Sequence, residues 1–226
     1  YKRQLDEFAP QAAIEAAIHE VNRDENVHGC LLFRPLPSFV DESHMCELLD
    51  PKKDIDGITL ASLASVFTDG HAGYPPATAA ACIQLLDHYQ VPLQGKHVVV
   101  VGRSLVVGKP VSMMLLRRNA SVTICHSKTE NLADIMRSAD VVICATGRAR
   151  TFGAQFFGPG QTVLDVGINF DTQGNLCGDV DFAEVEPVVA AITPVPGGIG
   201  TVTTSVTMAH TVAAAEAALA ARTGRR

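Results

Sequence analysis

The chain has 226 residues, of which 47% are hydrophobic, 5% aromatic and 19% charged. This length predicts one large domain or two modest ones, and the aliphatic content argues against a disordered chain. The longest purely aliphatic run, Val98 to Val101, is far shorter than the ~20 residues of a membrane helix, so no membrane span is expected. A formal net charge of −6 argues against a nucleic-acid partner.

The first residue is Tyr1 rather than Met, and no apolar signal-peptide core follows it. We therefore expect the sequence to begin partway into a longer protein. None of the six cysteines forms a C-x-x-C pair, which argues against a structural zinc site or a disulfide framework. Reduced core thiols in a cytoplasmic protein without a metal are the expectation.

Two helices and a strand are predicted in the first part of the chain. Apolar residues recur at helical spacing from Ala9 to Val21. A buried strand is expected from Val27 to Phe33, ended by the proline-containing run that follows it. A second helix is expected from Ala79 to Tyr89, with Thr78 as its N-cap.

Beyond Gln90, strands and helices alternate regularly. The predicted strands are 96–102, 120–125, 140–145, 161–167 and a short apolar stretch at 188–192, and the predicted helices are 110–119, 130–138 and 203–221. Near-continuous Val and Ile in the strands indicates an α/β fold with a parallel sheet covered by helices on both faces.

A glycine-bearing turn follows the first of these strands. It runs from Gly102 through Arg103 and Ser104 to Gly108. Such a strand-to-helix turn presents backbone N–H groups and the helix dipole to a pyrophosphate. The strict G-x-G-x-x-G spacing is absent, so a plain structural turn would explain these residues about as well.

The second strand is followed by His126, Ser127 and Lys128 rather than by an acid. Folds that prefer NAD usually place an acid there for the ribose hydroxyl, whereas NADP needs a cation and hydroxyls. Arg103 suits the extra phosphate beside Ser127, because a guanidinium binds phosphate bidentately. We therefore expect NADP; the alternative is that Arg103 and Lys128 are solvated surface charges.

Two more glycine turns follow later strands, at Thr146-Gly147 and at Gly167-Ile168-Asn169. They fall at the strand ends where open α/β sheets bind ligands. The segment from Thr193 to Thr201 contains two prolines and three glycines, which predicts a rigid loop that a ligand approaches closely. A turn between domains is a compatible alternative.

Together these motifs resemble the bifunctional methylenetetrahydrofolate dehydrogenase/methenyltetrahydrofolate cyclohydrolase family. The motifs that carry the resemblance are Val27-His28-Gly29, Pro35-Leu36-Pro37, Asp54-Ile55-Asp56-Gly57, Gly102-Arg103-Ser104, Cys125-His126-Ser127, Asp165-Val166-Gly167-Ile168-Asn169 and the run from Pro194 to Gly200. Their order and spacing are specific, and ordinary hydroxy-acid dehydrogenases do not resemble the loops at Asp54–Gly57 and Pro194–Gly200.

The resemblance implies two domains with an active-site cleft between them. Residues 1–91 would form an N-terminally incomplete folate domain, completed by the C-terminal helix 204–226, and residues 92–203 a Rossmann-like NADP domain. The implied reaction is NADP-dependent oxidation of methylenetetrahydrofolate to methenyltetrahydrofolate, followed by hydrolysis to formyltetrahydrofolate. A homodimer is also implied.

The resemblance also implies the site residues. Asp56 would contact the pterin ring, whose N–H groups a neutral pocket would leave unpaired. An Asx turn with Gly57 is the alternative role of Asp56. The implied cofactor contacts are Gly102, Arg103, Ser104, Ser127, Thr146, Gly147, Ile168 and Gly200, and the implied substrate contacts besides Asp56 are Pro196, Gly197 and Gly198.

The chain departs from the family pattern at several positions. The family's catalytic lysine lies in a Tyr-x-x-x-Lys motif upstream of the position of Tyr1, and neither Lys52 nor Lys53 is assigned its role. Phe33 replaces a glutamine that serves the hydrolytic step, so a dehydrogenase-only enzyme or a non-catalytic NADP- or folate-binding paralogue is the alternative. Thr201 replaces a proline and restores an N–H and a hydroxyl, and His210 replaces an asparagine, with a packed or capping role expected.

Overall fold

The computed structural model describes residues 1–70 and 72–224. The chain forms two compact units, which we describe separately. The α unit comprises Tyr1–Ala77 with Thr207–Arg226, and the sheet unit comprises Thr78–Val206. The assignment of folate to the first and NADP to the second stays a prediction.

The α unit contains α1 (Gln11–Arg23), α2 (Glu42–Leu48), α3 (Leu60–Thr68) and the later part of α8 (Ile199–Thr223). Its buried core consists of Ile14, Ile18, Val40, Met45, Cys46, Leu49 and Ile58. The Lys53 ammonium closes the C-terminal end of α1, donating to the carbonyls of Val21, Asn22 and Asp24 at 2.6, 3.0 and 2.7 Å. Lys53 therefore has a structural role, because it satisfies carbonyls that the helix leaves unpaired.

The predicted strand from Val27 to Phe33 is wrong. Within residues 1–70 and 72–224, the segment pairs at one position only, where Cys30 forms a parallel bridge with Asp54. A strand needs a neighbour that exchanges hydrogen bonds along its length. Because this segment finds such a partner at a single residue, its apolar character does not produce a strand.

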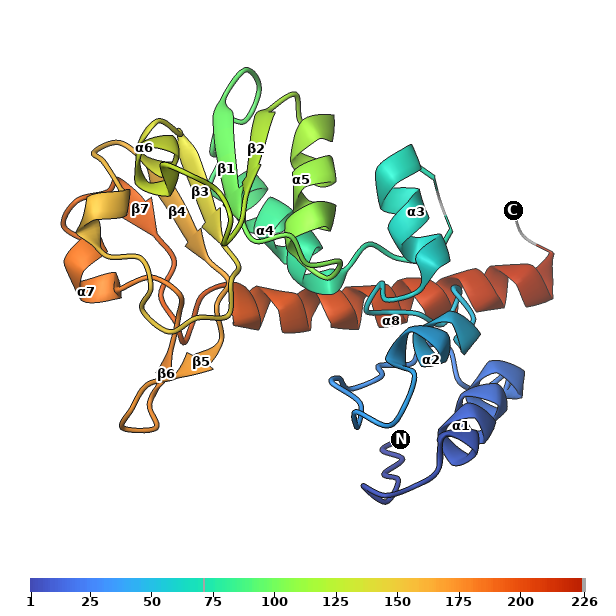
Figure 1. Cartoon of the computed structure of the whole chain (residues 1–226). Helices are drawn as coiled ribbons and strands as arrows, with labels where there is room; N and C mark the ends of the chain where they lie inside the picture. Colours follow the sequence, from blue (N-terminus) through green and yellow to red (C-terminus); the bar gives the residue numbers. More distant parts are fainter. Residues whose placement is uncertain (71, 225–226) are drawn as a thin grey trace. The chain divides into compact units, whose positions relative to one another are not determined.

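The sheet unit is built on five parallel strands in the order β2-β1-β3-β4-β7, as Figure 1 shows. Their bounds are β1 (His97–Val101), β2 (Ser121–Cys125), β3 (Val141–Cys144), β4 (Thr162–Asp165) and β7 (Ala191–Ile192). All of β3 and most of β1 are buried, as expected for strands covered on both faces. The predicted α/β class with a parallel sheet is confirmed.

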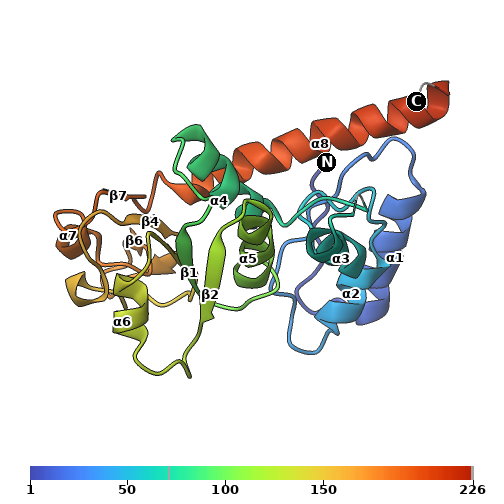
Figure 2. The same cartoon turned by 90° about the horizontal axis from the view of Figure 1, so that it is seen from above.

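Helices cover both faces of this sheet. The chain moves from β1 to β2 in one direction and from β2 to β3 in the other, so right-handed crossovers put α5 (Gly108–Arg117) and α6 (Leu132–Arg137) on opposite faces. Figure 2 shows α4 (Ala77–His88) and α5 on one side and α6 on the other. The prediction of Thr78 as N-cap is wrong. The helix α4 begins at Ala77, directly after Pro76, so Thr78 lies inside the helix.

Three small features of the sheet unit were not predicted. They are the 3-10 turn η1 (Ala154–Phe156), the antiparallel pair β5 (Asn169–Phe170) and β6 (Leu176–Cys177), and α7 (Phe182–Val185). All six cysteines are free thiols and five are buried. None of the helices described combines the length and hydropathy needed to cross a membrane.

Candidate functional site

The carboxyl ends of β1 and β3 mark the point at which the strand order reverses. Open α/β sheets bind ligands in the crevice at such a point. Gly102, directly after β1, has φ +132°, and a Cβ there would lie 2.2 Å from the carbonyl oxygen of Ala145, directly after β3. Glycine is therefore required for the two turns to lie against each other.

The turn from Gly102 to Gly108 is stabilised by hydrogen bonds to one of its own side chains. The Ser104 hydroxyl oxygen accepts hydrogen bonds from the N–H groups of Val107, at 3.1 Å, and Gly108, at 3.5 Å. Its own hydrogen stays available to a ligand. Arg103 is exposed, and no carboxylate in the described part of the chain pairs with its guanidinium. The turn thus offers a cation and a hydroxyl.

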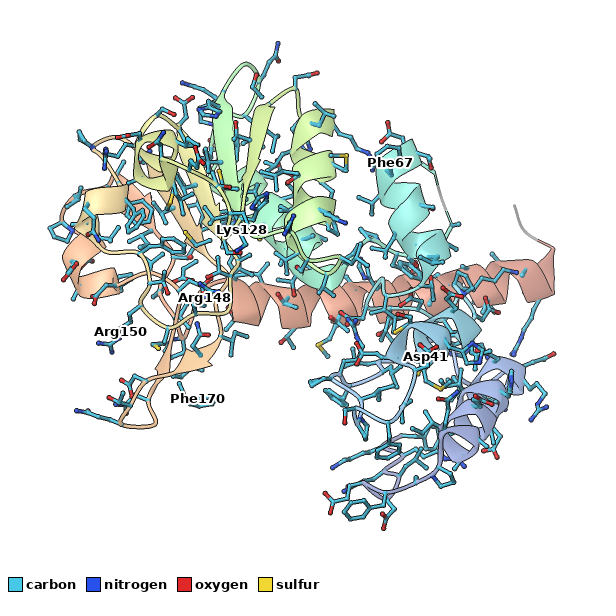
Figure 3. All side chains as sticks on the ribbon, in the orientation of Figure 1. Asp41, Phe67, Lys128, Arg148, Arg150 and Phe170 are labelled. Atoms are coloured by element: carbon cyan, nitrogen blue, oxygen red, sulfur yellow. The ribbon has the colours of Figure 1, made fainter. Side chains whose placement is uncertain are left out.

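Ser127 and Lys128 form an exposed turn that follows β2 after one residue, His126. Three hydrogen bonds fix this turn. The His126 N–H donates to Thr129 Oγ1 at 2.9 Å, the Lys128 N–H donates to His126 Nδ1 at 3.2 Å, and the Thr129 N–H donates to the His126 carbonyl at 2.9 Å. Figure 3 shows Lys128 and Arg148 near the carboxyl ends of the parallel strands. No acid occupies the end of β2, so this edge fits an anionic group such as the extra phosphate of NADP.

The turn after β3 is arranged differently. Its backbone N–H groups at Thr146, Gly147 and Arg148 all donate to the carboxylate of Asp179. Asp179 is fully buried, and Asp165 at the end of β4 is also buried. Burial raises the pKa of Asp165 to about 6, although three backbone N–H groups act in the opposite direction. The sequence reasoning assigned no role to either carboxylate.

One pocket combines the turn after β4 with the loop before α8. Its lining includes Ile168, Pro196, Gly197, Gly198 and Gly200, all predicted contacts, together with Asp165, Leu176 and Thr201. Gly197 has φ +100°, and a Cβ at Gly198 would lie 2.4 Å from the Pro194 carbonyl oxygen. The N–H and the hydroxyl of Thr201 both donate to the Gly198 carbonyl, at 3.2 and 2.7 Å. The first turn of α8 therefore holds the end of this loop through the Gly198 carbonyl.

Asp56 lies half-buried in the α unit. Its carboxylate has no hydrogen bond to any residue the structure describes, so the alternative of an Asx turn with Gly57 is not formed. The neighbouring Asp54 fixes this loop instead, accepting two backbone N–H groups and the Ser62 hydroxyl at 2.7 Å. Burial raises the pKa of Asp56, while Arg34 acts to lower it. Asp56 is thus a partly desolvated acceptor.

Two departures from the family pattern have clear positions. His210 Nδ1 lies 2.9 Å from the Ile55 carbonyl oxygen, so the ring donates there, and its centroid is 4.9 Å from that of Tyr74. His210 is thus a packed residue that holds the Asp54–Gly57 loop. Phe33 is 78% exposed and contributes nothing to the core. No trio of His, Cys, Asp or Glu suited to a metal occurs in the described ranges.

Known sequences match this chain along most of its length. Residues 76–219 match the family model for the tetrahydrofolate dehydrogenase/cyclohydrolase NAD(P)-binding domain, and residues 1–56 match that for the catalytic domain. The bifunctional protein FolD of Carboxydothermus hydrogenoformans is 50% identical over 218 residues, which are 96% of this chain and 75% of the relative. The FolD protein of Clostridioides difficile is 47% identical over 93% of this chain and 74% of its own.

Solved structures agree with the sequence matches. The bifunctional enzyme FolD of Campylobacter jejuni has a TM-score of 0.91 and 36% identity, covering 94% of this chain and 75% of that one. The Trypanosoma brucei dehydrogenase-cyclohydrolase, solved with NADP and an inhibitor, has a TM-score of 0.89 and 32% identity over the same shares.

Proposed function

This chain belongs to the tetrahydrofolate dehydrogenase/cyclohydrolase family, and we propose how its residues divide the two reactions of that family. The resemblance inferred from the motifs is confirmed. The protein oxidises methylenetetrahydrofolate to methenyltetrahydrofolate with NADP and hydrolyses the product to formyltetrahydrofolate. Its residues then have to select NADP and hold the pterin.

The observation that carries the cofactor assignment is that Arg103 follows β1 and Ser127 follows β2, which is the neighbouring strand. Both are exposed, Arg103 has no carboxylate partner among the residues described, and β2 ends without an acid. We assign them to the extra phosphate of NADP, which a guanidinium and a hydroxyl can hold together. Gly102 and Ser104 would bind the remaining dinucleotide phosphates, which the backbone N–H groups of this turn and the start of α5 can receive.

We assign the rest of the cofactor to the other turns of the same sheet edge. Thr146 and Gly147 follow β3, and Ile168, which is 67% exposed, lies with Gly200 in the pocket lining. When bound, NADP supplies the hydride acceptor. Ile168 offers the apolar surface on which a nicotinamide ring can lie, and Gly200 leaves open space beside it.

Folate binding is assigned to Asp56 and to the loop residues Pro196, Gly197 and Gly198. The Asp56 carboxylate is half-buried and accepts no hydrogen bond from the described residues, so it is available to accept the N–H groups of a pterin. The loop residues present a fixed backbone to the substrate. Under this proposal Asp56 contributes from the α unit, whereas the cofactor contacts and the loop residues Pro196, Gly197 and Gly198 belong to the sheet unit.

We also propose a cytoplasmic homodimer. Six free thiols, five of them buried, suit a reducing compartment. The β2 edge of the sheet in the described unit has no neighbouring strand, and such an edge suits association with a second copy. Sedimentation of the purified protein tests the stoichiometry, and a monomer at micromolar concentration would overturn it.

The activity is tested with the protein in its natural full length. Addition of methylenetetrahydrofolate and NADP should produce reduced cofactor, measured by its absorbance, followed by slower decay of the methenyl product. Absence of any NADP-dependent absorbance change would overturn the dehydrogenase assignment.

Phe33 allows the two steps to be separated. Because its exposed ring cannot hydrogen-bond, we expect Phe33→Gln to raise the rate of methenyl hydrolysis and to leave the KM for NADP unchanged. Phe39→Gln, which alters another exposed phenylalanine of the α unit, is the control. Equal hydrolysis rates in all three proteins would remove a role for position 33 in this step.

A further inference from the structure

Asp179 connects two of the turns at the sheet edge. Its carboxylate accepts from the Thr146 N–H, the Thr146 hydroxyl at 2.9 Å, the Gly147 N–H at 3.2 Å and the Arg148 N–H at 2.9 Å. It also accepts from Asn169 Nδ2 at 3.0 Å. One buried side chain therefore holds the turn after β3 and the start of β5 together.

The three successive N–H groups form a concave site of the kind that binds anions. In many nucleotide-binding proteins such a site would receive a phosphate, but here the protein's own carboxylate fills it. The turn after β3 consequently has no free N–H in this run for a phosphate. What it can present to a ligand is a fixed backbone shape.

Asp179 is itself held in place by Asp165. The Asp165 carboxylate accepts from the N–H groups of Asp179, at 3.0 Å, Val180, at 2.9 Å, and Gly167, at 2.9 Å. A Cβ at Gly178 would lie 1.9 Å from Asp165 Oδ2, and one at Gly167 would lie 2.3 Å from Asp179 Oδ1. The close contacts leave both carboxylates without room for another position.

We propose that Asp179 is a positioning residue for NADP, which sets the shape of the Thr146–Arg148 turn and fixes it to Asn169 beside Ile168. This inference rests on the proposed function, in which Thr146, Gly147 and Ile168 contact the cofactor. Asp179 is fully buried and acts through these residues, not by touching the cofactor.

A carboxylate is needed because of the number of donors. Oδ2 accepts three of the hydrogen bonds and Oδ1 accepts two. An asparagine has one acceptor oxygen, and its NH₂ group would face donors. At least two N–H groups of the turns would then lose their partner, so the turns must move to find others.

The test measures binding of NADP and of tetrahydrofolate separately, by calorimetry on the folded full-length protein. For Asp179→Asn we expect the Kd for NADP to rise at least roughly tenfold and the Kd for tetrahydrofolate to change less than about twofold. Asn169→Ala, which removes a single donor, should raise the Kd for NADP about threefold. Asp171→Asn is the comparison variant, because Asp171 also accepts two backbone N–H groups but makes no bond to the Thr146–Arg148 turn. The bonds of Asp171 lie within the β5–β6 turn, apart from an ion pair with Arg150 at 3.3 Å.

The outcomes separate this inference from the proposed function. If the unaltered protein binds NADP and Asp179→Asn binds it equally well, the positioning role is wrong and the function stands. If Asp179→Asn weakens NADP and tetrahydrofolate binding equally, Asp179 stabilises the whole fold and has no specific role in NADP binding, which would overturn the inference. Should Asp179→Asn not fold, an unchanged Kd in Asn169→Ala would overturn the inference. Failure of the unaltered protein to bind NADP would instead overturn the proposed function.

Discussion

Two glycine turns lie against each other at the carboxyl edge of the sheet, yet they are built in opposite ways. In the turn after β1, a side-chain hydroxyl at Ser104 holds the backbone, and the Arg103 guanidinium is left without a carboxylate partner in the described residues. In the turn after β3, a buried carboxylate takes three successive N–H groups. The first turn offers charge to a ligand, and the second offers only its shape.

The difference teaches that a glycine turn at a strand end does not define its own role. Both turns fit the same sequence expectation of a site that a cofactor approaches closely. Their roles separate only through residues that lie elsewhere in the chain, since Asp179 follows β6 and comes back to the turn after β3. Substitutions in the two turns should therefore have different effects.

The largest effect is expected for Gly102→Ala. The new Cβ would lie 2.2 Å from a backbone oxygen, and φ is +132°, so the β1 and β3 turns must separate. We expect the free energy of unfolding to fall by about 3 kcal/mol or more, together with loss of measurable NADP binding. Chemical denaturation and calorimetry check this. Unchanged stability would mean that the close approach of the two turns is not required.

Asp165→Asn tests, through the pH dependence of stability, how Asp165 holds Asp179 and thereby the turn after β3. The pKa of Asp165 is raised from 3.8 to about 6 by burial, so the folded protein holds this proton more tightly than the unfolded chain does. Its contribution to stability is complete below about pH 4 and is lost as the pH rises through about 6. The advantage of the unaltered protein over Asp165→Asn should shrink by about 2 kcal/mol between pH 4 and pH 7.

Denaturation curves collected at several pH values measure that difference. Asp171→Asn serves as a control because hydrogen bonds to its exposed turn lower the pKa of Asp171 instead. A difference between the unaltered protein and Asp165→Asn that stays constant from pH 4 to pH 7 would contradict the assignment.

Arg103→Ala addresses the charge that the first turn offers. We expect the Kd for NADP to rise roughly 10- to 100-fold, which is one to a few kcal/mol for a charge-assisted bond, with a much smaller change for NAD. Arg117→Ala is the control, because it removes another arginine, which lies at the opposite end of α5 from this turn. Equal losses for NADP and NAD would rule against binding of the extra phosphate at Arg103.

These positions also show what the sequence could and could not predict. The Val-rich strands and the turns after them are local signals, and the parallel pairing of β1 to β4 followed from them. The pocket residues Ile168 and Gly200 followed from the family resemblance. Asp179 was missed because its partners lie about thirty residues upstream, and β5 and β6, which return the chain, are two residues long. Strands that short carry no periodic pattern.

Other omissions in the α unit had local signals. Thr59 accepts from the Ser62 N–H and begins α3, and Asp41 accepts from the His44 N–H and begins α2. Both are N-cap residues of the usual type. The strand predicted over 27–33 failed for the opposite reason: the local pattern was present, but a strand depends on a partner that sequence does not reveal.

The smallest effect is expected for Gly147→Ala in the second turn. Gly147 has φ +66°, but an added Cβ would meet nothing within 4 Å, so the cost is conformational and about 1 kcal/mol in the free energy of unfolding. Gly174→Ala is a matched control, with φ +81° and equally open space in the β5–β6 turn. Both variants should lose similar stability, while only Gly147→Ala should weaken NADP binding, since the methyl group would stand between the turn and the cofactor. If the two variants bind NADP equally well, the cofactor does not contact the second turn at Gly147. The two turns would then differ only in how much each contributes to stability.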